Sequence, residues 1–296
     1  MTTLLPGAPV AERVLSEARD AIAVGARAGR SAPALASVHR GAATPFSVYL
    51  KRQAKAAEAT GVRFQPIALS PTADALELSF VTGRLAADPD VDGVLVEHPL
   101  PPSFDFLGAL DRLPAEKDVD GVGALNLGHL LSHRPVQVPA VARAALRVAD
   151  HYGIAVAGRR VAIVGRSETV GLPLALLLLA RGATGDATVT VAHSKTPDLG
   201  RALRDCEVVF SCAGQPGLLD RRVVPKDAAV IDVGLSTVPD PERPGGIRIA
   251  GDADAASLDG WASALTPVPG GIGPVTVACL MANTVHAWGL RGARPT

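Results

Sequence analysis

The chain has 296 residues, of which 48% are hydrophobic, and its 29 basic and 29 acidic residues leave a formal net charge of zero. This length and hydrophobic content predict two domains, each with its own core. Because the charges balance, no field favours nucleic acid or an anionic membrane as a partner. A small-molecule ligand is therefore expected.

The three cysteines, Cys206, Cys212 and Cys279, are scattered and lack the spacing of metal ligands. Such usage indicates a reducing compartment and argues against a disulfide scaffold or a metal site. No run approaches the roughly 20 apolar residues that cross a bilayer, and the N-terminus lacks the pattern of a signal peptide. We therefore expect a cytoplasmic protein.

Helical and extended patterns alternate through the first half of the chain. The predicted helices are residues 11–27, 49–60, 76–87 and 107–113. The predicted strands are residues 33–39, 63–69 and 93–97. Alternation of this kind indicates a parallel α/β sheet.

The second half shows the succession of a doubly wound sheet. Its predicted helices are residues 141–152, 174–181 and 275–289, and its predicted strands are residues 160–164, 188–192, 208–211 and 229–233. The last helix is expected to return to the first domain. We therefore predict an α/β protein with a cleft between two domains, a substrate domain of residues 1–138 plus 275–296 and a Rossmann-type dinucleotide-binding domain of residues 139–274.

Two glycine-rich segments interrupt these patterns. Thr266-Pro-Val-Pro-Gly-Gly-Ile-Gly-Pro-Val-Thr276 cannot be ordinary helix or strand, and a loop of this composition brings bare backbone close to something flat. Gly165 and Gly171 flank a strand-to-helix turn, where backbone N–H groups and the helix dipole favour a phosphate. Because the turn is not G-x-G-x-x-G, taken alone it is equally compatible with a structural bend.

The strand of residues 188–192 ends without the Asp or Glu that would bind a ribose 2′-hydroxyl. Arg166 and Ser194, with Lys195 as a further candidate, instead offer donors for a 2′-phosphate. NADP is therefore favoured over NAD, although Lys195 is also compatible with a solvated surface charge.

These segments resemble the bifunctional methylenetetrahydrofolate dehydrogenase/methenyltetrahydrofolate cyclohydrolase family. Gly-Arg-Ser-x-x-Val-Gly-x-Pro, from Gly165 to Pro173, is similar to the family's cofactor turn at every fixed position. The resemblance implies oxidation of a tetrahydrofolate derivative with NADP by a homodimer. The cofactor-binding residues that it implies are Gly165, Arg166, Ser167, Val170, Ser194, Ala213, Gly214, Asp232, Gly234, Gly273 and Thr276.

The same resemblance implies a substrate site with two exchanged residues. The family's catalytic lysine position is Gln53, and the glutamine that partners it is Glu97. Lys51 and Lys55 are each two residues from Gln53, about 200° around a helix, so neither replaces the lysine simply. The implied catalytic residues are Tyr49, Gln53, Glu97 and Asp120, of which Asp120 grips the pterin ring. The implied substrate-binding residues are Tyr49, Glu97, His98, Asp120, Gly270, Gly271 and Pro274.

Two alternatives remain open at Glu97. Burial at the end of a parallel strand would raise its pKa toward use as a general acid, but a carboxylate that only accepts a hydrogen bond from Gln53 has equal weight. His98 is compatible with titration near neutral pH or with a structural role. Further departures from the family pattern are Phe46, Val122 to Ala124, Val136 and a four-residue insertion at residues 183–186.

Three functions follow from these observations. The first is an NADP-dependent methylenetetrahydrofolate dehydrogenase with weak or absent cyclohydrolase activity, because an amide cannot supply the lysine's proton. The second is a recruited enzyme that acts on another iminium or aminal, or transfers a one-carbon unit from folate. The third is a non-catalytic nucleotide-binding partner.

Overall fold

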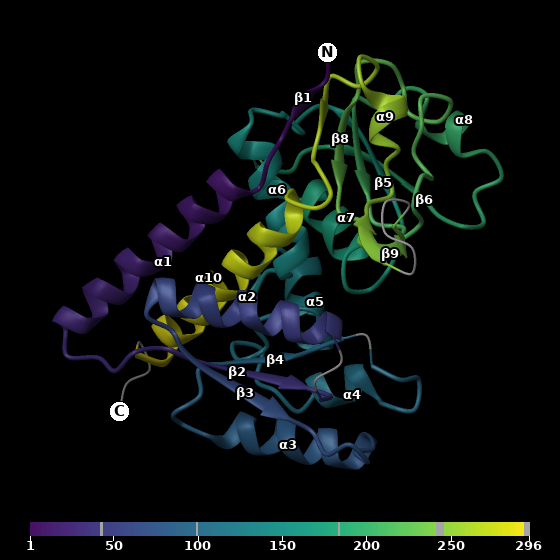
Figure 1. Cartoon of the computed structure of the whole chain (residues 1–296). Coiled ribbons are helices and arrows are strands. Elements are labelled where there is room, and N and C mark those ends of the chain that lie inside the picture. The colour runs from purple at the N-terminus through teal and green to yellow at the C-terminus, as the bar shows by residue number, and fades with distance from the viewer. Residues whose placement is uncertain (42–43, 99, 183, 241–245, 293–296) are drawn as a thin grey trace. The chain divides into compact units, whose positions relative to one another are not determined.

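The computed structural model describes residues 1–41, 44–98, 100–182, 184–240 and 246–292, without the side chains of residues 44–47. The chain folds into two compact units. Unit 1 comprises Met1–Val10 and Val141–Thr276, and unit 2 comprises Ala11–Ala140 and Val277–Thr296. Each unit has its own parallel sheet with helices (Figure 1), which confirms the predicted α/β class.

Unit 2 is built on a three-stranded parallel sheet in the order β3-β2-β4. Its strands are β2 (Ala34–His39), β3 (Arg63–Ala68) and β4 (Gly93–Val96). Its helices include α1 (Ala8–Arg27), α2 (Thr44–Thr60), α3 (Ala75–Ala87), α4 (Phe106–Leu110) and α5 (Ala124–Leu131). Helix α2 lies on one side of the sheet and α3 on the other (Figure 1).

The central strand β2 forms a largely apolar run of small and branched residues, and Ala34 to Val38 are buried on both faces. Ala36 and Val38 join Val94, Val96 and Leu78 of α3 in one hydrophobic core. Helix α3 begins where the Asp74 side chain accepts a hydrogen bond from the backbone N–H of Glu77 at 2.9 Å. This core fixes the strand ends that carry the candidate substrate residues.

Unit 1 contains a six-stranded parallel sheet in the order β1-β11-β8-β7-β5-β6. Its strands are β1 (Thr3–Leu4), β5 (Arg160–Val164), β6 (Thr188–Ala192), β7 (Val208–Ser211), β8 (Ala229–Asp232) and β11 (Ala264–Leu265). Its helices are α6 (Ala140–His151), α7 (Gly171–Leu179), α8 (Leu199–Leu203) and α9 (Ala255–Leu258). An antiparallel hairpin joins β9 (Ser236–Pro239) to β10 (Ile247–Ala250).

The structure differs from the predicted organisation at the N-terminus. Residues 1–10, expected in the substrate domain, belong to unit 1 because β1 pairs with β11. A strand of two residues is too short to show the alternation that sequence patterns detect. Helix α5, the hairpin and the two shortest helices of unit 1 were also absent from the prediction.

The last helix, α10 (Ile272–Gly292), begins three residues earlier than expected and continues from unit 1 into unit 2. Its Trp288 indole N–H donates to the Ser31 carbonyl at 2.8 Å, and the Arg30 guanidinium lies 3.7 Å from the Trp288 ring centroid. The end of α10 therefore completes unit 2, as expected. Among the helices in the described ranges, none is long and apolar enough to cross a membrane.

Two glycine substitutions test the packing of α1 against Trp288 of α10. Alanine favours a helix interior by about 1 kcal/mol over glycine. At Gly25 of α1, however, a Cβ atom would lie 1.9 Å from the Trp288 ring, whereas at Gly83 of α3 it would meet nothing within 4 Å. We expect Gly25→Ala to lower the free energy of unfolding by about 1–3 kcal/mol and the control Gly83→Ala to raise it slightly. Urea denaturation measures both, and a stabilised Gly25→Ala would contradict the packing.

Candidate functional site

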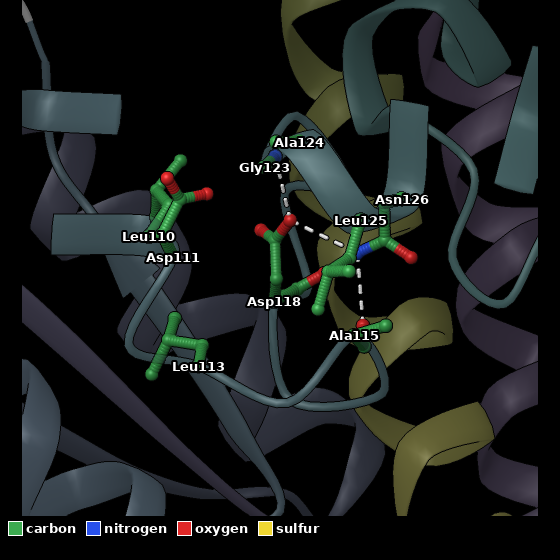
Figure 2. Close-up of a pocket in the computed structure, with 9 residues that line it drawn as sticks. All are labelled: Leu110, Asp111, Leu113, Ala115, Asp118, Gly123, Ala124, Leu125 and Asn126. Carbon is green, nitrogen blue, oxygen red and sulfur yellow. Dashed lines mark hydrogen bonds between the residues drawn. The ribbon is translucent and has the colours of Figure 1, made fainter. Parts of the chain in front are cut away.

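A buried carboxylate, Asp118, holds the acidic turn at residues 117–121. Its Oδ1 accepts a hydrogen bond from the backbone N–H of Gly121 at 3.0 Å. Its Oδ2 accepts from the backbone N–H of Gly123 at 2.8 Å and from Asn126 Nδ2 at 2.9 Å (Figure 2). Burial raises the pKa of Asp118 to about 6, against these hydrogen bonds that favour its charged form. Asp118 therefore supports the turn and leaves Asp120 for another role.

Both ends of the acidic turn are anchored. Lys117 Nζ donates to the carbonyls that close helix α3, those of Leu85, Ala86 and Asp88, at 3.2, 2.9 and 2.6 Å. Asn283 of α10 donates through Nδ2 to the carbonyl of Val119 at 2.8 Å. Hydrogen bonds to the end of α3 and from α10 therefore hold the backbone that carries Asp120.

Glu97 and Gln53, predicted to form a pair, are brought together by the structure. Glu97 follows strand β4 and is 4% exposed, and Gln53 of α2 is 0% exposed. Gln53 Nε2 donates to Glu97 Oε1 at 2.5 Å. Ser37 of β2, which sequence patterns did not single out, donates through Oγ to the same oxygen at 2.9 Å. No periodic or motif signal in the sequence marks Ser37.

Burial dominates the electrostatics of this site. It raises the pKa of Glu97, and the Gln53 and Ser37 donors oppose that rise by stabilising the carboxylate. Burial, together with the charges of Glu97 and Asp120, also raises the pKa of Tyr49. Tyr49 therefore keeps its phenolic proton, and Glu97 can hold a proton at a higher pH than an exposed glutamate.

The amide of Gln53 is only half satisfied. Its Oε1 is buried and has no hydrogen-bond partner among the described residues. Leaving such an acceptor unpaired costs about 1–3 kcal/mol. Residues that carry a cost of this kind are concentrated at functional sites.

His98 and Asp120 form a second pair in unit 2. His98 Nε2 lies 3.6 Å from Asp120 Oδ2, and its ring lies against Phe106 of α4 with the ring centroids 5.2 Å apart. The Asp120 carboxylate raises the pKa of His98 above its ordinary value. The His98 side chain is 39% exposed.

The predicted cofactor turn in unit 1 has the backbone of a phosphate cradle. Gly165 follows β5 with φ +123°, and a Cβ atom there would lie 2.5 Å from the Cys212 carbonyl. A Cβ atom at Gly171 would lie 2.4 Å from the Gly165 carbonyl. Ser167 Oγ accepts from the Val170 N–H at 3.2 Å at the start of α7. Only glycine fits these two positions, because a Cβ atom at either would collide with backbone.

The adenosine-side residues lie on the surface of unit 1. Arg166 follows the cofactor turn's first glycine, Ser194 and Lys195 follow β6, and all three are exposed. The His193 N–H donates to Thr196 Oγ1 at 2.9 Å, which closes the turn that carries Ser194. The predicted insertion includes Ala183, which is outside the described residues.

Two buried carboxylates organise the loops that carry Ala213, Gly214 and Gly234. Asp252 accepts from Ser211 Oγ at 2.7 Å, from the Ala213 N–H at 2.8 Å and from the Gln215 N–H at 2.6 Å. Asp232 accepts from the N–H groups of Gly234, Asp252 and Ala253 at 2.9, 3.1 and 2.8 Å. The Asp232 side chain is thus occupied by backbone donors. Asp252 was missed because its own segment shows no motif.

The glycine-rich loop is hydrogen-bonded to the N-terminal segment of its own unit. The Gly270 carbonyl accepts from the Gly7 N–H at 2.7 Å, and Gly270 has φ +107°. A Cβ atom at Gly271 would lie 2.6 Å from the Pro267 carbonyl, whereas at Gly273 it would meet nothing within 4 Å. Because Gly273 has no side chain and no neighbour at this point, another molecule can closely approach the backbone in the first turn of α10.

Pro274 and Thr276 also lie in the first turns of α10. Thr276 Oγ1 donates to the Ile272 carbonyl at 3.3 Å, so this hydroxyl is used within the helix. The predicted site residues thus form two groups. Unit 2 carries Tyr49, Gln53, Glu97, His98 and Asp120, and unit 1 carries the remainder.

Comparison with known proteins identifies a family for both units. Residues 5–120 match the model for the tetrahydrofolate dehydrogenase/cyclohydrolase catalytic domain, and residues 139–291 match that for its NAD(P)-binding domain. The bifunctional protein FolD of Chloroflexus aurantiacus is 38% identical over 96% of each chain. The bifunctional protein FolD 1 of Rhodococcus jostii is 38% identical over 99% of this chain and 95% of its own.

Solved structures agree with this assignment. The methylenetetrahydrofolate dehydrogenase-cyclohydrolase of Trypanosoma brucei, complexed with NADP cofactor and inhibitor, superposes with a TM-score of 0.91 at 35% identity and covers 99% of both chains. A methylenetetrahydrofolate dehydrogenase from Bombyx mori has a TM-score of 0.91 at 32% identity and covers 99% of this chain and 100% of its own. The chain therefore belongs to the tetrahydrofolate dehydrogenase/cyclohydrolase family.

Proposed function

We propose that this protein oxidises methylene-tetrahydrofolate to methenyl-tetrahydrofolate with NADP and that its cyclohydrolase activity is weak or absent. The observation that carries the proposal is the hydrogen bond from the Gln53 amide to the buried Glu97 carboxyl, in a chain that keeps the cofactor turn, Tyr49, Asp120 and the glycine-rich loop. Membership of the family and the NADP complex of the Trypanosoma brucei relative support the dehydrogenase.

The backbone of unit 1 suits NADP. The turn from Gly165 to Gly171 offers N–H groups to the phosphates, and Arg166 and Ser194 offer donors to a 2′-phosphate. Gly273 leaves space for a flat ring beside the backbone of α10. When bound, NADP supplies the hydride acceptor, and the protein contributes binding and orientation.

The substrate residues of unit 2 suit a pterin. Asp120 presents a carboxylate on a rigid turn, which is the acceptor that the amino and amide N–H groups of a pterin require. Tyr49 keeps a phenolic proton for donation. Hydride transfer needs mainly this positioning and little proton transfer.

The cyclohydrolase step needs more than positioning. Adding water to the methenyl carbon and opening the ring require a group that gives and takes a proton. The Gln53 amide cannot do so, and its N–H is engaged with Glu97. We therefore expect methenyl-tetrahydrofolate to accumulate as the product.

The ionisable Glu97 favours a second candidate function. A carboxyl whose pKa is raised by burial can act as an acid or base on another iminium or aminal, or in passing a one-carbon unit from folate to a small metabolite. Tight NADP binding without NADPH formation from methylene-tetrahydrofolate would support this recruited enzyme. Failure to bind any dinucleotide would instead support a non-catalytic partner.

We also propose a cytoplasmic homodimer. Leu172 and Leu179 of α7 and Val191 of the edge strand β6 are large apolar side chains exposed on unit 1. An apolar helix face beside an unpaired strand edge suits contact with a second copy. A mass of one chain by light scattering would contradict the dimer. Cys206, Cys212 and Cys279 form no disulfide in the described part of the chain, which fits a reducing compartment.

The NADP preference can be tested at Arg166. Loss of a charge-assisted contact to the 2′-phosphate costs about 1.5–3 kcal/mol, so Arg166→Ala is expected to raise KM for NADP about 10–100-fold. KM for NAD, which lacks this phosphate, should change little. Arg204→Ala, at another exposed arginine of unit 1, is the control and should alter neither. Equal changes in both KM values would contradict the assignment.

The loss of cyclohydrolase can be tested by rebuilding the lysine pair. In Gln53→Lys the new ammonium faces the Glu97 carboxyl and forms an ion pair, so we expect only a small gain in methenyl hydrolysis. In the double variant Gln53→Lys/Glu97→Gln the lysine can give and take a proton, and hydrolysis should rise by about two orders of magnitude.

The control for this test is Gln53→Met, which has a similar size and no amine. The absorbance of methenyl-tetrahydrofolate measures hydrolysis, and NADPH formation shows that each variant remains active. A folded double variant that oxidises methylene-tetrahydrofolate but hydrolyses no faster than the wild type would contradict the explanation.

A further inference from the structure

Ser37 is a fully buried hydroxyl in the central strand of unit 2. Its neighbours Ala36 and Val38 belong to the hydrophobic core that includes Leu78 of α3. Alternate residues of a strand point to opposite faces, and Ala36 and Val38 flank Ser37, so the serine points to the other face, where its Oγ reaches Glu97. A buried hydroxyl is costly unless it is hydrogen-bonded, and the Glu97 carboxyl fulfils that requirement.

The two donors to Glu97 converge on one oxygen. Gln53 Nε2 and Ser37 Oγ both donate to Oε1, at 2.5 and 2.9 Å. Within the described residues no donor reaches Oε2. A proton added to Oε1 would face two hydrogens already directed at that atom. The described residues therefore hold the carboxyl through one oxygen.

We infer that Ser37 is a positioning residue, which together with Gln53 fixes Glu97 through Oε1 and leaves Oε2 as the oxygen that contacts the bound ligand. The serine acts from a strand that is paired on both sides, so its hydroxyl cannot follow movements of the glutamate. The part of the inference that concerns the ligand rests on the proposed folate site. The hydrogen bonds that fix Glu97 do not depend on the proposed function.

The other ionisable groups near Glu97 are the same in the wild type and in variants at Ser37. Asp120 and His98 act on it from the acidic turn and from the segment after β4, and Tyr49 lies on α2 beside Gln53. None of these is altered by a substitution at Ser37. Since the hydroxyl stabilises the carboxylate, its removal must raise the pKa of Glu97.

The test measures that pKa directly in the full-length protein. Glutamate labelled with ¹³C at the carboxyl is titrated by NMR in the wild type, Ser37→Ala and Ser37→Thr, and Glu97→Gln identifies the Glu97 resonance. Thr82→Val is the matched control, because Thr82 is equally buried but donates only to backbone carbonyls of α3. The pH profile of NADPH formation is recorded alongside.

We expect Ser37→Ala to raise the pKa of Glu97 by about one to two pH units, and the Glu97-dependent limb of the activity profile to move in the same direction. Ser37→Thr, which restores a hydroxyl, should return both toward the wild type, and Thr82→Val should shift neither. Thermal unfolding shows whether each variant is folded under these conditions.

An unchanged pKa of Glu97 in folded Ser37→Ala would overturn the positioning role. A shifted pKa with an unshifted activity limb would overturn the assignment of the ligand contact to Oε2. If the wild type forms no NADPH from methylene-tetrahydrofolate while the NMR shift is observed, the proposed function fails and the positioning by Ser37 stands. The two failures are thus distinguishable.

Discussion

The functional site of unit 2 depends on one interaction, the acceptance by Glu97 Oε1 of hydrogen bonds from Gln53 and Ser37. A buried carboxyl is tolerated only when donors compensate for the water it has lost. The two donors, Gln53 and Ser37, are neutral, so Glu97 remains ionisable. The residue that faces Glu97 from α2 is therefore an amide and not an ammonium.

Buried carboxylates also shape the supporting loops. Asp118 fixes the acidic turn of unit 2 through backbone N–H groups, and Asp252 does the same for the loop after β7 in unit 1. Such bonds to charged acceptors hold irregular backbone in one conformation. The residues proposed to touch ligands, such as Asp120, are therefore not needed to hold these loops.

The sequence predicted much of this arrangement. Periodicity located the strands β5, β6 and β7, and the motifs around Gly165 and Thr266 identified the cofactor side and the family. The pairing of Gln53 with Glu97 was also predicted, and the structure places the two in hydrogen-bond contact. Ser37 and Asp252 were not found, because a single buried hydroxyl or carboxylate has no periodic or motif signal. The short strand β1 was missed since its pairing depends on residues about 260 positions away.

We propose a protein that retains the dehydrogenase activity of its family and whose cyclohydrolase activity is weak or absent. The most direct test of this proposal is a parallel assay of the wild-type protein, which measures NADPH formation from methylene-tetrahydrofolate and hydrolysis of methenyl-tetrahydrofolate under the same conditions. The account predicts NADPH formation with methenyl-tetrahydrofolate accumulating as the product. Methenyl hydrolysis at a rate equal to or above that of NADPH formation would contradict it.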